Sequence, residues 1–170
     1  MSDAPVVPGL ALVPLDGGGA ERLAAFCRRA TDFFELVGGM PGGPETAADI
    51  LAPLAAHITP GTIHRFGLES DGDLIGVLEL LEGYPTADIW YVGLLVLVPD
   101  RRRSGLGSSV WAGARDWIQS RGGTWVRLIV QQQNTGARAF WEGRGFSIEK
   151  ELVARNYALE SRCWRMSRAV

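Results

Sequence analysis

The first third of the chain combines a short strand-like stretch with two helix-like patterns of apolar residues. Residues 10–15 suit a strand, and the Asp-Gly-Gly-Gly run after them interrupts regular structure. Apolar residues then recur at three- and four-residue steps from Ala20 to Val37, which predicts one amphipathic helix that stops at Gly38-Gly39. A second helix is predicted from Pro44, since proline suits the first helical position. It should be short, because Pro53 interrupts the helical pattern.

The middle of the chain changes to the two-residue period of strands. Residues 62–69 and 74–82 predict a hairpin with Asp71-Gly72 at its tip. The next run, IWYVGLLVLV at residues 89–98, is apolar at both parities and rich in β-branched and aromatic residues. This pattern is typical of a central strand that is covered on both faces.

The last third predicts two more helices and three more strands. One apolar face predicts a helix from Leu106 that ends at Gly122-Gly123, and Asn134 can cap a shorter helix. The strands are expected at residues 124–130, 146–153 and 163–167. Strand, helix and strand in succession form a right-handed crossover, so the strands at 89–98 and 124–130 are parallel. The predicted fold class is therefore α/β (α+β), with three layers around a mixed sheet.

The totals fit one globular domain over residues 1–170, with residues 1–8 as a flexible N-terminus. A net charge of −2 without a basic stripe argues against nucleic acid as a partner. The longest apolar run is too short to span a bilayer, and no basic segment precedes an apolar one at the N-terminus. We therefore expect a cytoplasmic protein without a membrane partner. Cys27 and Cys163 have no CxxC spacing, so no metal site or disulfide is predicted.

The chemistry of the chain concentrates in the run RRRSGLGSS, at residues 101–109. It lies between the end of a buried strand and the start of a helix, where unpaired N–H groups and the helix dipole favour a phosphate. Glycines at 105 and 107 would let the phosphate approach, although they could serve only a tight turn. A P-loop would need a lysine, and a dinucleotide fingerprint would need glycine in place of Val110 and an acidic residue near 127–131. Both alternatives fail.

Two motifs carry a family resemblance. Arg102-Arg103-Ser104-Gly105-Leu106-Gly107 matches the pattern Gln/Arg-x-x-Gly-x-Gly/Ala. Residues 134–141, NTGARAFW, followed by Gly145-Phe146, match Asn-x-x-Ala-x-x-Phe-Tyr and Gly-Phe. With both motifs in register, the chain resembles the GNAT superfamily of N-acetyltransferases. The resemblance implies a mostly antiparallel sheet of six to seven strands, flanked by about four helices and splayed between the fourth and fifth strands.

The resemblance also implies acetyl-CoA as co-substrate. Main-chain groups of the fourth strand would pair with pantetheine, and the N–H groups at the turn would hold the pyrophosphate. Asn134 would contact the coenzyme, cap its helix, or do both. The full set of expected acetyl-CoA contacts is Leu95, Val96, Leu97, Arg102, Arg103, Ser104, Gly105, Leu106, Gly107, Ser108, Asn134 and Phe140.

Catalysis would require a base for the amine and stabilisation of the departing thiolate. Relatives often use a tyrosine as the acid, but this chain has Trp141 there, whose indole cannot supply a proton at neutral pH. The thiolate could leave unassisted, Tyr91 or Tyr157 could substitute, or catalysis could be weak. Glu79 and Tyr91 are the preferred candidates for the base, ahead of the further candidates His57, His64 and Asp88.

The resemblance further implies an acceptor pocket built by the first two helices, their loop, and the third and fourth strands. The expected substrate-binding residues are Phe33, Phe34, Tyr84 and Trp90, with Glu35, Met40 and Tyr91 as further members. An aromatic wall suits an amphipathic amine, either a small molecule or a peptide. The predicted function is an N-acetyltransferase that works by direct transfer and without a metal, and a homodimer is expected from the resemblance. The alternatives are a non-catalytic CoA-binding module and, less favoured, a nucleotide-binding domain.

Overall fold

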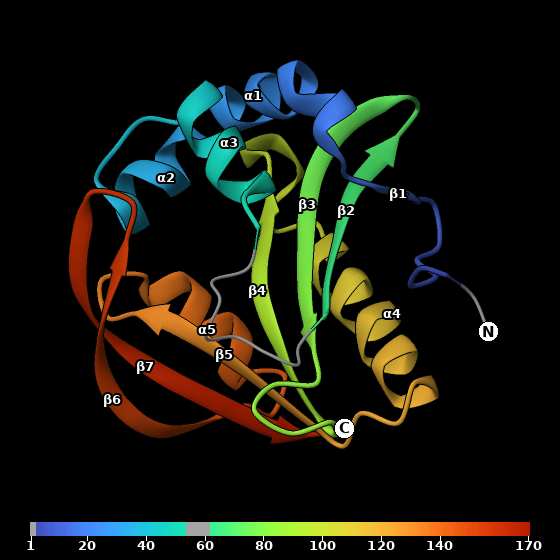
Figure 1. The fold of residues 1–170 in the computed structure, drawn as a ribbon, viewed down its shortest axis with the longest axis vertical. Coiled ribbons are helices and arrows are strands. Elements are labelled where there is room, and N and C mark those ends of the chain that lie inside the picture. The colour runs from blue at the N-terminus through green and yellow to red at the C-terminus, as the bar shows by residue number, and fades with distance from the viewer. Residues whose placement is uncertain (1–2, 54–61) are drawn as a thin grey trace.

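One seven-stranded sheet forms the centre of the protein, in a computed structural model that describes residues 3–53 and 62–170. The strand order is β1-β2-β3-β4-β5-β7-β6 (Figure 1). The strands are β1 (Ala11–Pro14), β2 (Thr62–Ser70), β3 (Asp73–Glu82), β4 (Ile89–Leu97), β5 (Trp125–Gln131), β6 (Ser147–Asn156) and β7 (Leu159–Ala169). The pair β4–β5 is parallel and every other neighbouring pair is antiparallel, which confirms the predicted mixed sheet.

The parallel pair separates along its length. β4 and β5 pair from Ile89 and Trp125 as far as Val92 and Leu128, and the rest of β4 has no partner in β5. In Figure 1 the two strands diverge towards the upper edge of the sheet. This confirms the expected splay between the fourth and fifth strands.

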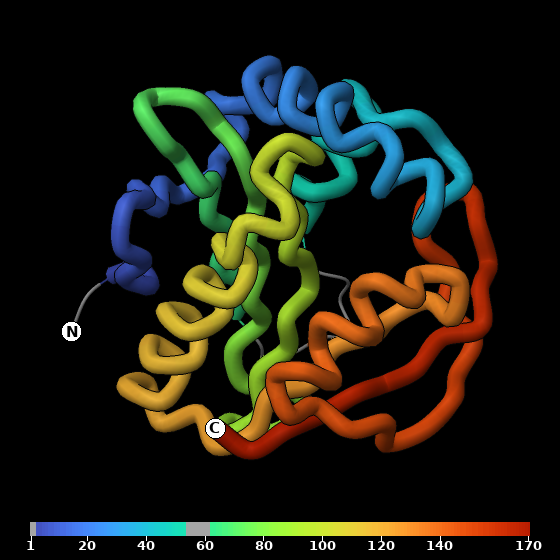
Figure 2. Tube along the Cα trace, turned by 180° about the vertical axis from the view of Figure 1, so that it is seen from behind, coloured from blue at the N-terminus to red at the C-terminus, as the bar shows by residue number. Residues whose placement is uncertain are grey.

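Within the described residues, five α-helices cover the two faces of the sheet. They are α1 (Ala20–Arg29), α2 (Thr31–Gly38), α3 (Pro44–Leu51), α4 (Leu106–Ser120) and α5 (Thr135–Glu142), with a 3-10 turn, η2 (Pro99–Arg101), before α4. Buried side chains of α4 and α5 form one core cluster with β3, β4 and β5, and those of α1, α2 and α3 form another on the opposite face. Figure 2 shows α4 and α5 together on one side. The three predicted layers are therefore present.

The predicted helix from Ala20 to Val37 is wrong in one respect, because the structure has two helices there. The break falls at Ala30, whose φ of −101° and ψ of 24° leave the helical region. The change of direction lets Phe26 and Phe34 both pack into the same core. The apolar periodicity continues through Ala30, so the break leaves no mark in the pattern.

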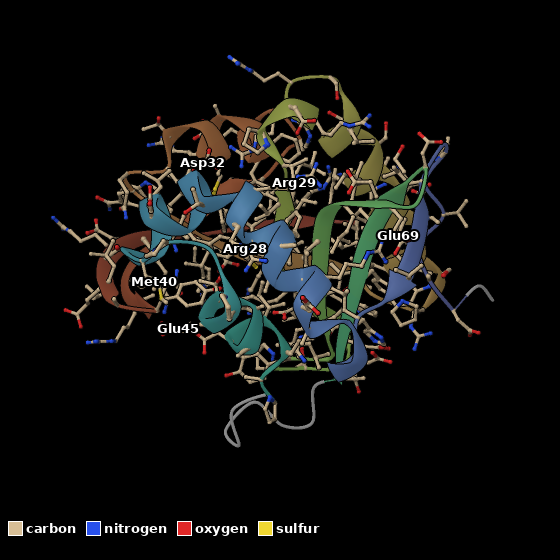
Figure 3. All side chains as sticks on the ribbon, turned by 90° about the horizontal axis from the view of Figure 1, so that it is seen from above. Arg28, Arg29, Asp32, Met40, Glu45 and Glu69 are labelled. Atoms are coloured by element: carbon tan, nitrogen blue, oxygen red, sulfur yellow. The ribbon has the colours of Figure 1, made fainter. Side chains whose placement is uncertain are left out.

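Ion pairs fasten α1 to the tip of the β2–β3 hairpin. Arg29 Nη1 lies 2.9 Å from Asp73 Oδ1, and Arg22 pairs with Glu69. Figure 3, which looks onto the helices from above, shows Arg29 on α1 and Glu69 on β2. These contacts set the first helical layer against the half of the sheet that precedes the splay.

The chain before β1 packs against α4. Val7 is buried among the residues of the α4 core cluster. A Cβ atom on Gly113 would lie 2.4 Å from the carbonyl oxygen of Val6, so only glycine permits this approach. Among the described residues, no helix is long and apolar enough to cross a bilayer.

Candidate functional site

A cavity of about 450 Å³ lies where β4 and β5 separate. Its walls come from both helical layers, from the two diverging strands and from the turn that joins β6 to β7. The lining residues are Phe33, Val37, Asp49, Tyr91, Val92, Gly93, Leu94, Leu95, Leu128, Ile129, Val130, Gln131, Asn134, Ala137, Trp141, Ala154, Arg155, Asn156 and Tyr157. The volume of the cavity falls within the range of small-molecule sites, which is about 300–1,000 Å³.

The free edge of β4 forms one side of this cavity. The N–H of Val98 donates to the carbonyl of Ile75 at 2.9 Å, which sets the alternation of the β3–β4 ladder. Val96 therefore directs its main-chain groups to β3, whereas Leu95 and Leu97 direct theirs to the side that β5 has left. Two of the three predicted pantetheine contacts thus lie on the open edge.

Unpaired amides gather at the turn before α4. Gly105 is the N-cap residue with a φ of 86°, and Arg103 has a φ of 57°. In the described part of the chain, the N–H groups of residues 103–107 donate to no protein acceptor. A second cavity of about 440 Å³, lined partly by Arg101, Ser104 and Gly105, opens beside them. The turn therefore presents five free amides, whereas the N–H of Ser108, which is also predicted to hold the pyrophosphate, already donates to the Gly105 carbonyl at 3.0 Å.

Arg102 has structural partners on both sides of this turn. Its Nε donates to the carbonyl of Leu97 at 2.8 Å, and its Nη2 donates to Asp32 Oδ1 at 3.0 Å. Asp32 lies on α2 and is labelled in Figure 3. The hydrogen bonds from Arg102 lower the pKa of the Asp32 carboxyl. The guanidinium thus ties the first helical layer to the end of β4, so its charge is partly neutralised before any diphosphate binds.

Sequence reasoning missed Arg144, which joins the two motifs. Its guanidinium carbon lies 3.5 Å from the centre of the Phe140 ring, and its Nη1 donates to the Phe140 carbonyl at 2.7 Å. It also donates to the Ser108 hydroxyl in the first turn of α4. Burial lowers the pKa of this guanidinium. The positive charge of Arg144 therefore lies beside the turn that is predicted to bind the diphosphate. The contact between Arg144 and Ser108 joins residues that are distant in sequence, so no local motif indicates it.

Asn134 and the aromatic residues of α5 hold the far wall. Asn134 Oδ1 accepts the N–H of Ala137 at 3.1 Å, so the predicted N-cap is present, and the residue also lines the cavity. Trp141 is buried against Trp111, Phe140 and Phe146, with ring centres 4.9 to 5.5 Å apart. Trp141 therefore contributes shape and packing to this wall of the cavity.

Glu79 lies on the other side of β4 from α5. Its Oε2 accepts from Arg65 Nε at 2.9 Å. The carboxylate does not itself line the cavity. It lies directly over Gly93, and Gly93 is one of the lining residues. Tyr91, the second predicted base, lines the cavity directly.

Tyr157 enters the cavity from the β6–β7 turn. It has a φ of 50° and stacks edge-on against Phe34 at 6.0 Å. A Cβ on Gly38 would lie 2.4 Å from Tyr157 Cδ2, so the glycine at the end of α2 makes room for the ring. Burial, followed by the nearby Cys27, Asp49 and Glu79, raises the pKa of the phenol, which therefore stays protonated at neutral pH.

The predicted acceptor residues are dispersed. Phe33 lines the cavity, whereas Phe34 and Trp90 are fully buried core residues. Tyr84 lies 6.1 Å from Tyr91, ring centre to ring centre, in the β3–β4 connection. The structure therefore brings only Phe33 and Tyr91 of the wider aromatic set to the cavity wall.

The remaining base candidates have other surroundings. His64 Nε2 lies 2.7 Å from Glu82 Oε2, and its ring stacks on Trp90 in the α4 core. Hydrogen bonds from threonine side chains lower the pKa of Asp88, which is fully exposed. His57 lies outside the described residues. Among the residues that the structure describes, no group of three or more potential metal ligands comes together.

The splayed parallel pair, the free strand edge and the amide-lined helix start form an arrangement whose geometry suits a long phosphate-bearing ligand. A family model described as "Acetyltransferase (GNAT) family" matches residues 27–146, more than half of the chain. The chain belongs to the GNAT acetyltransferase family.

Solved structures with the same fold agree with this membership. An acetyltransferase from Thermus thermophilus is 22% identical, over 96% of this chain and 99% of the other, with a TM-score of 0.73. A spermidine N-acetyltransferase from Vibrio cholerae, in complex with CoA and spermine, is 20% identical over 95% of each chain, with a TM-score of 0.69. Arabidopsis thaliana Naa50, in complex with the bisubstrate analogue CoA-Ac-MVNAL, is 15% identical over 95% and 99%, with a TM-score of 0.66. No curated protein sequence matches the chain.

Proposed function

We propose that the protein transfers an acetyl group from acetyl-CoA to a primary amine of a small molecule or peptide. Family membership supports the acyltransferase class. The observation that carries the proposal is a continuous path, which runs from the unpaired amides before α4, along the open edge at Leu97 and Leu95, into the cavity. This path has a polar start for phosphates and a β-strand edge that can pair with an amide-bearing arm.

The residues along this path fit the coenzyme. The N–H groups of residues 103–107 would hold the diphosphate, and Arg144 would add positive charge beside them. The N–H and C=O of Leu95 and the N–H of Leu97 would pair with the pantetheine amides, because the Leu97 carbonyl already accepts from Arg102. The aromatic wall formed by Phe140 and Trp141 would cover the arm. Acetyl-CoA supplies an acyl group that its thioester activates for transfer.

The reaction requires that the amine nitrogen lose a proton and that the departing sulfur be stabilised or protonated. As the N–C bond to the acceptor forms and the C–S bond breaks, the amine gives up a proton and the sulfur leaves as a thiolate. Glu79 is the proposed base, and Tyr91 is the second candidate. Trp141 can donate a hydrogen bond but no proton, so the thiolate leaves without a proton from this position.

The acceptor is proposed to carry positive charge and apolar bulk. Phe33, Tyr91 and Tyr157 give the cavity an aromatic wall, and the Asp49 carboxylate lies at its border. Aromatic faces and a carboxylate both favour a cationic amine. The Vibrio cholerae structure contains spermine and the Naa50 structure contains a peptide analogue, so both substrate classes belong in the test.

Turnover assays with acetyl-CoA test the proposal. Released CoA thiol is measured against polyamines, amino acids, aminoglycosides and peptides, with product masses to show N-acetylation. Binding is measured in parallel, since a ligand at 100 times its Kd stabilises the fold by about 2.7 kcal/mol. Stabilisation by acetyl-CoA without turnover on any amine would favour the non-catalytic module, for which the tryptophan at 141 is the supporting observation. A lack of stabilisation by acetyl-CoA would contradict both. A homodimer is a further proposal that analytical ultracentrifugation tests.

A further inference from the structure

Gly93 is the extra residue of a bulge in β4. The register of β3 with β4 passes from Glu79 opposite Leu94 to Leu80 opposite Val92, so Gly93 has no partner in β3. It also follows directly after Val92, the last residue of β4 that pairs with β5. Gly93 therefore lies where the two strands start to separate, and it lines the cavity.

The Glu79 carboxylate occupies the space that a side chain at 93 would fill. A Cβ atom on Gly93 would lie 2.4 Å from Glu79 Oε1 and 3.2 Å from its Cδ. This approach is closer than any non-bonded carbon and oxygen tolerate, so it exists only because residue 93 is glycine. The glycine thereby leaves room for the carboxylate of the next strand directly beside the part of the cavity wall that Gly93 forms.

Arg65 holds the other end of the same carboxylate. Its Nε donates to Glu79 Oε2 at 2.9 Å, and its Nη2 donates to the carbonyl of Ala52 at 2.6 Å. Two nitrogens of the Arg65 guanidinium are thus held, one by the end of α3 and the other by the middle of β3. Because Oε2 is occupied, Oε1 is the oxygen that remains for a proton from the cavity side.

We propose that Gly93 and Arg65 are positioning residues for Glu79, which they hold with Oε1 at the point where the cavity passes between the strands. The inference rests on the proposed function, because it assigns Glu79 as the base for the acceptor amine. Tyr157, which lines the cavity, supports the location: burial is the main reason that the pKa of its phenol is raised, and the charge of Glu79 adds to the shift after those of Cys27 and Asp49.

A double-mutant cycle with Glu79→Gln and Gly93→Ala tests the assignment. The new methyl group displaces the carboxylate, so we expect Gly93→Ala to lower kcat by at least about tenfold, and by no more than the 10²- to 10⁴-fold that general base catalysis typically contributes. The KM for acetyl-CoA should stay within about threefold. In the Glu79→Gln background, Gly93→Ala should change kcat by less than about twofold, because the base it displaces is already absent.

Arg65 is tested with a conservative pair. Arg65→Lys keeps a positive charge beside Oε2, whereas Arg65→Met removes it, and the lysine variant should retain several times more kcat. Equal losses from Gly93→Ala with and without Glu79 would show that the glycine acts on cavity shape, and that would overturn the inference. A wild-type chain that acetylates no amine would instead count against the proposed function, so the two failures are distinguishable. Thermal melts of each variant establish that the chain is folded.

Discussion

Gly107 is the position where one substitution best tests the proposed diphosphate site. It is the second residue of α4, and a Cβ there would lie 3.1 Å from Phe140 Cε2. Gly107→Asn adds bulk alone, whereas Gly107→Asp adds nearly the same bulk with a negative charge. An aspartate in the first turn of a helix favours the helix. We therefore expect both variants to fold, with a small shift of the Phe140 ring.

The charge sets the magnitude of the effect. Two unit charges about 5 Å apart, roughly one turn of helix, repel by about 3 kcal/mol at an effective dielectric constant of about 20. At about 1.4 kcal/mol for each factor of ten, the aspartate variant should bind acetyl-CoA about 200-fold more weakly than the asparagine variant. Added salt should narrow this difference, because it screens partly exposed charges.

Titration calorimetry with acetyl-CoA measures both affinities. Gly19→Ala is the remote control, because a Cβ at Gly19 would meet no atom within 4 Å, and it should bind as the wild type does. If the aspartate and asparagine variants bound acetyl-CoA with affinities within threefold of each other, the diphosphate would lie elsewhere and the reasoning would be refuted.

Three further predictions follow from packing and charge. Trp141→Ala should lower the free energy of unfolding by about 3–5 kcal/mol, because it empties a buried aromatic cluster, and Trp141→Phe should cost clearly less. Equal denaturant midpoints for the two variants would contradict this. The lowered pKa of Asp32 means that its pair with Arg102 stabilises the fold above the unfolded pKa of about 3.9 and that this contribution is lost as pH falls through the folded pKa. Asp32→Asn should therefore cost up to about 1 kcal/mol at pH 7, since the pair is partly exposed, and progressively less as the pH falls through the folded pKa; a difference that did not shrink towards acid pH would contradict the sign. Burial raises the pKa of the Cys27 and Cys163 thiols, so a disulfide reagent at pH 8 should label neither cysteine in the folded protein and both in denaturant; rapid labelling of the folded chain would count against their burial.

Most of the fold could be predicted from local patterns. The hairpin tip at Asp71-Gly72, the cap at Asn134 and the parallel crossover around α4 all depend on residues near each other in sequence. The break at Ala30 could not be predicted, because the apolar stripe runs through it and the reason lies in how Phe34 packs. The β7 strand extends beyond the expected residues 163–167, because residues 159–162 pair with β6 and residues 168–169 pair with β5, and this pairing is not visible in the local pattern.

The candidate site was most predictable where it depends on main-chain geometry. The turn at Gly105 follows from glycine spacing at a strand-to-helix junction. The roles of side chains were harder to predict because their partners are distant in sequence: Arg102 meets Asp32 on α2, and Arg144 meets Ser108 on α4. The position of the Glu79 carboxylate over Gly93 likewise depends on the register of β3 with β4, which cannot be deduced from the residue pattern of β4 alone.

The central claim is that the amides before α4 and the free edge of β4 hold acetyl-CoA. NMR hydrogen exchange of single amides, with and without acetyl-CoA, tests it most directly. We predict slower exchange on binding for residues 103–107 and for Leu95 and Leu97, and little change at Val96, whose N–H already bonds to β3. Protection confined to other segments, or equal protection at all three β4 residues, would contradict this account of where and how the coenzyme lies.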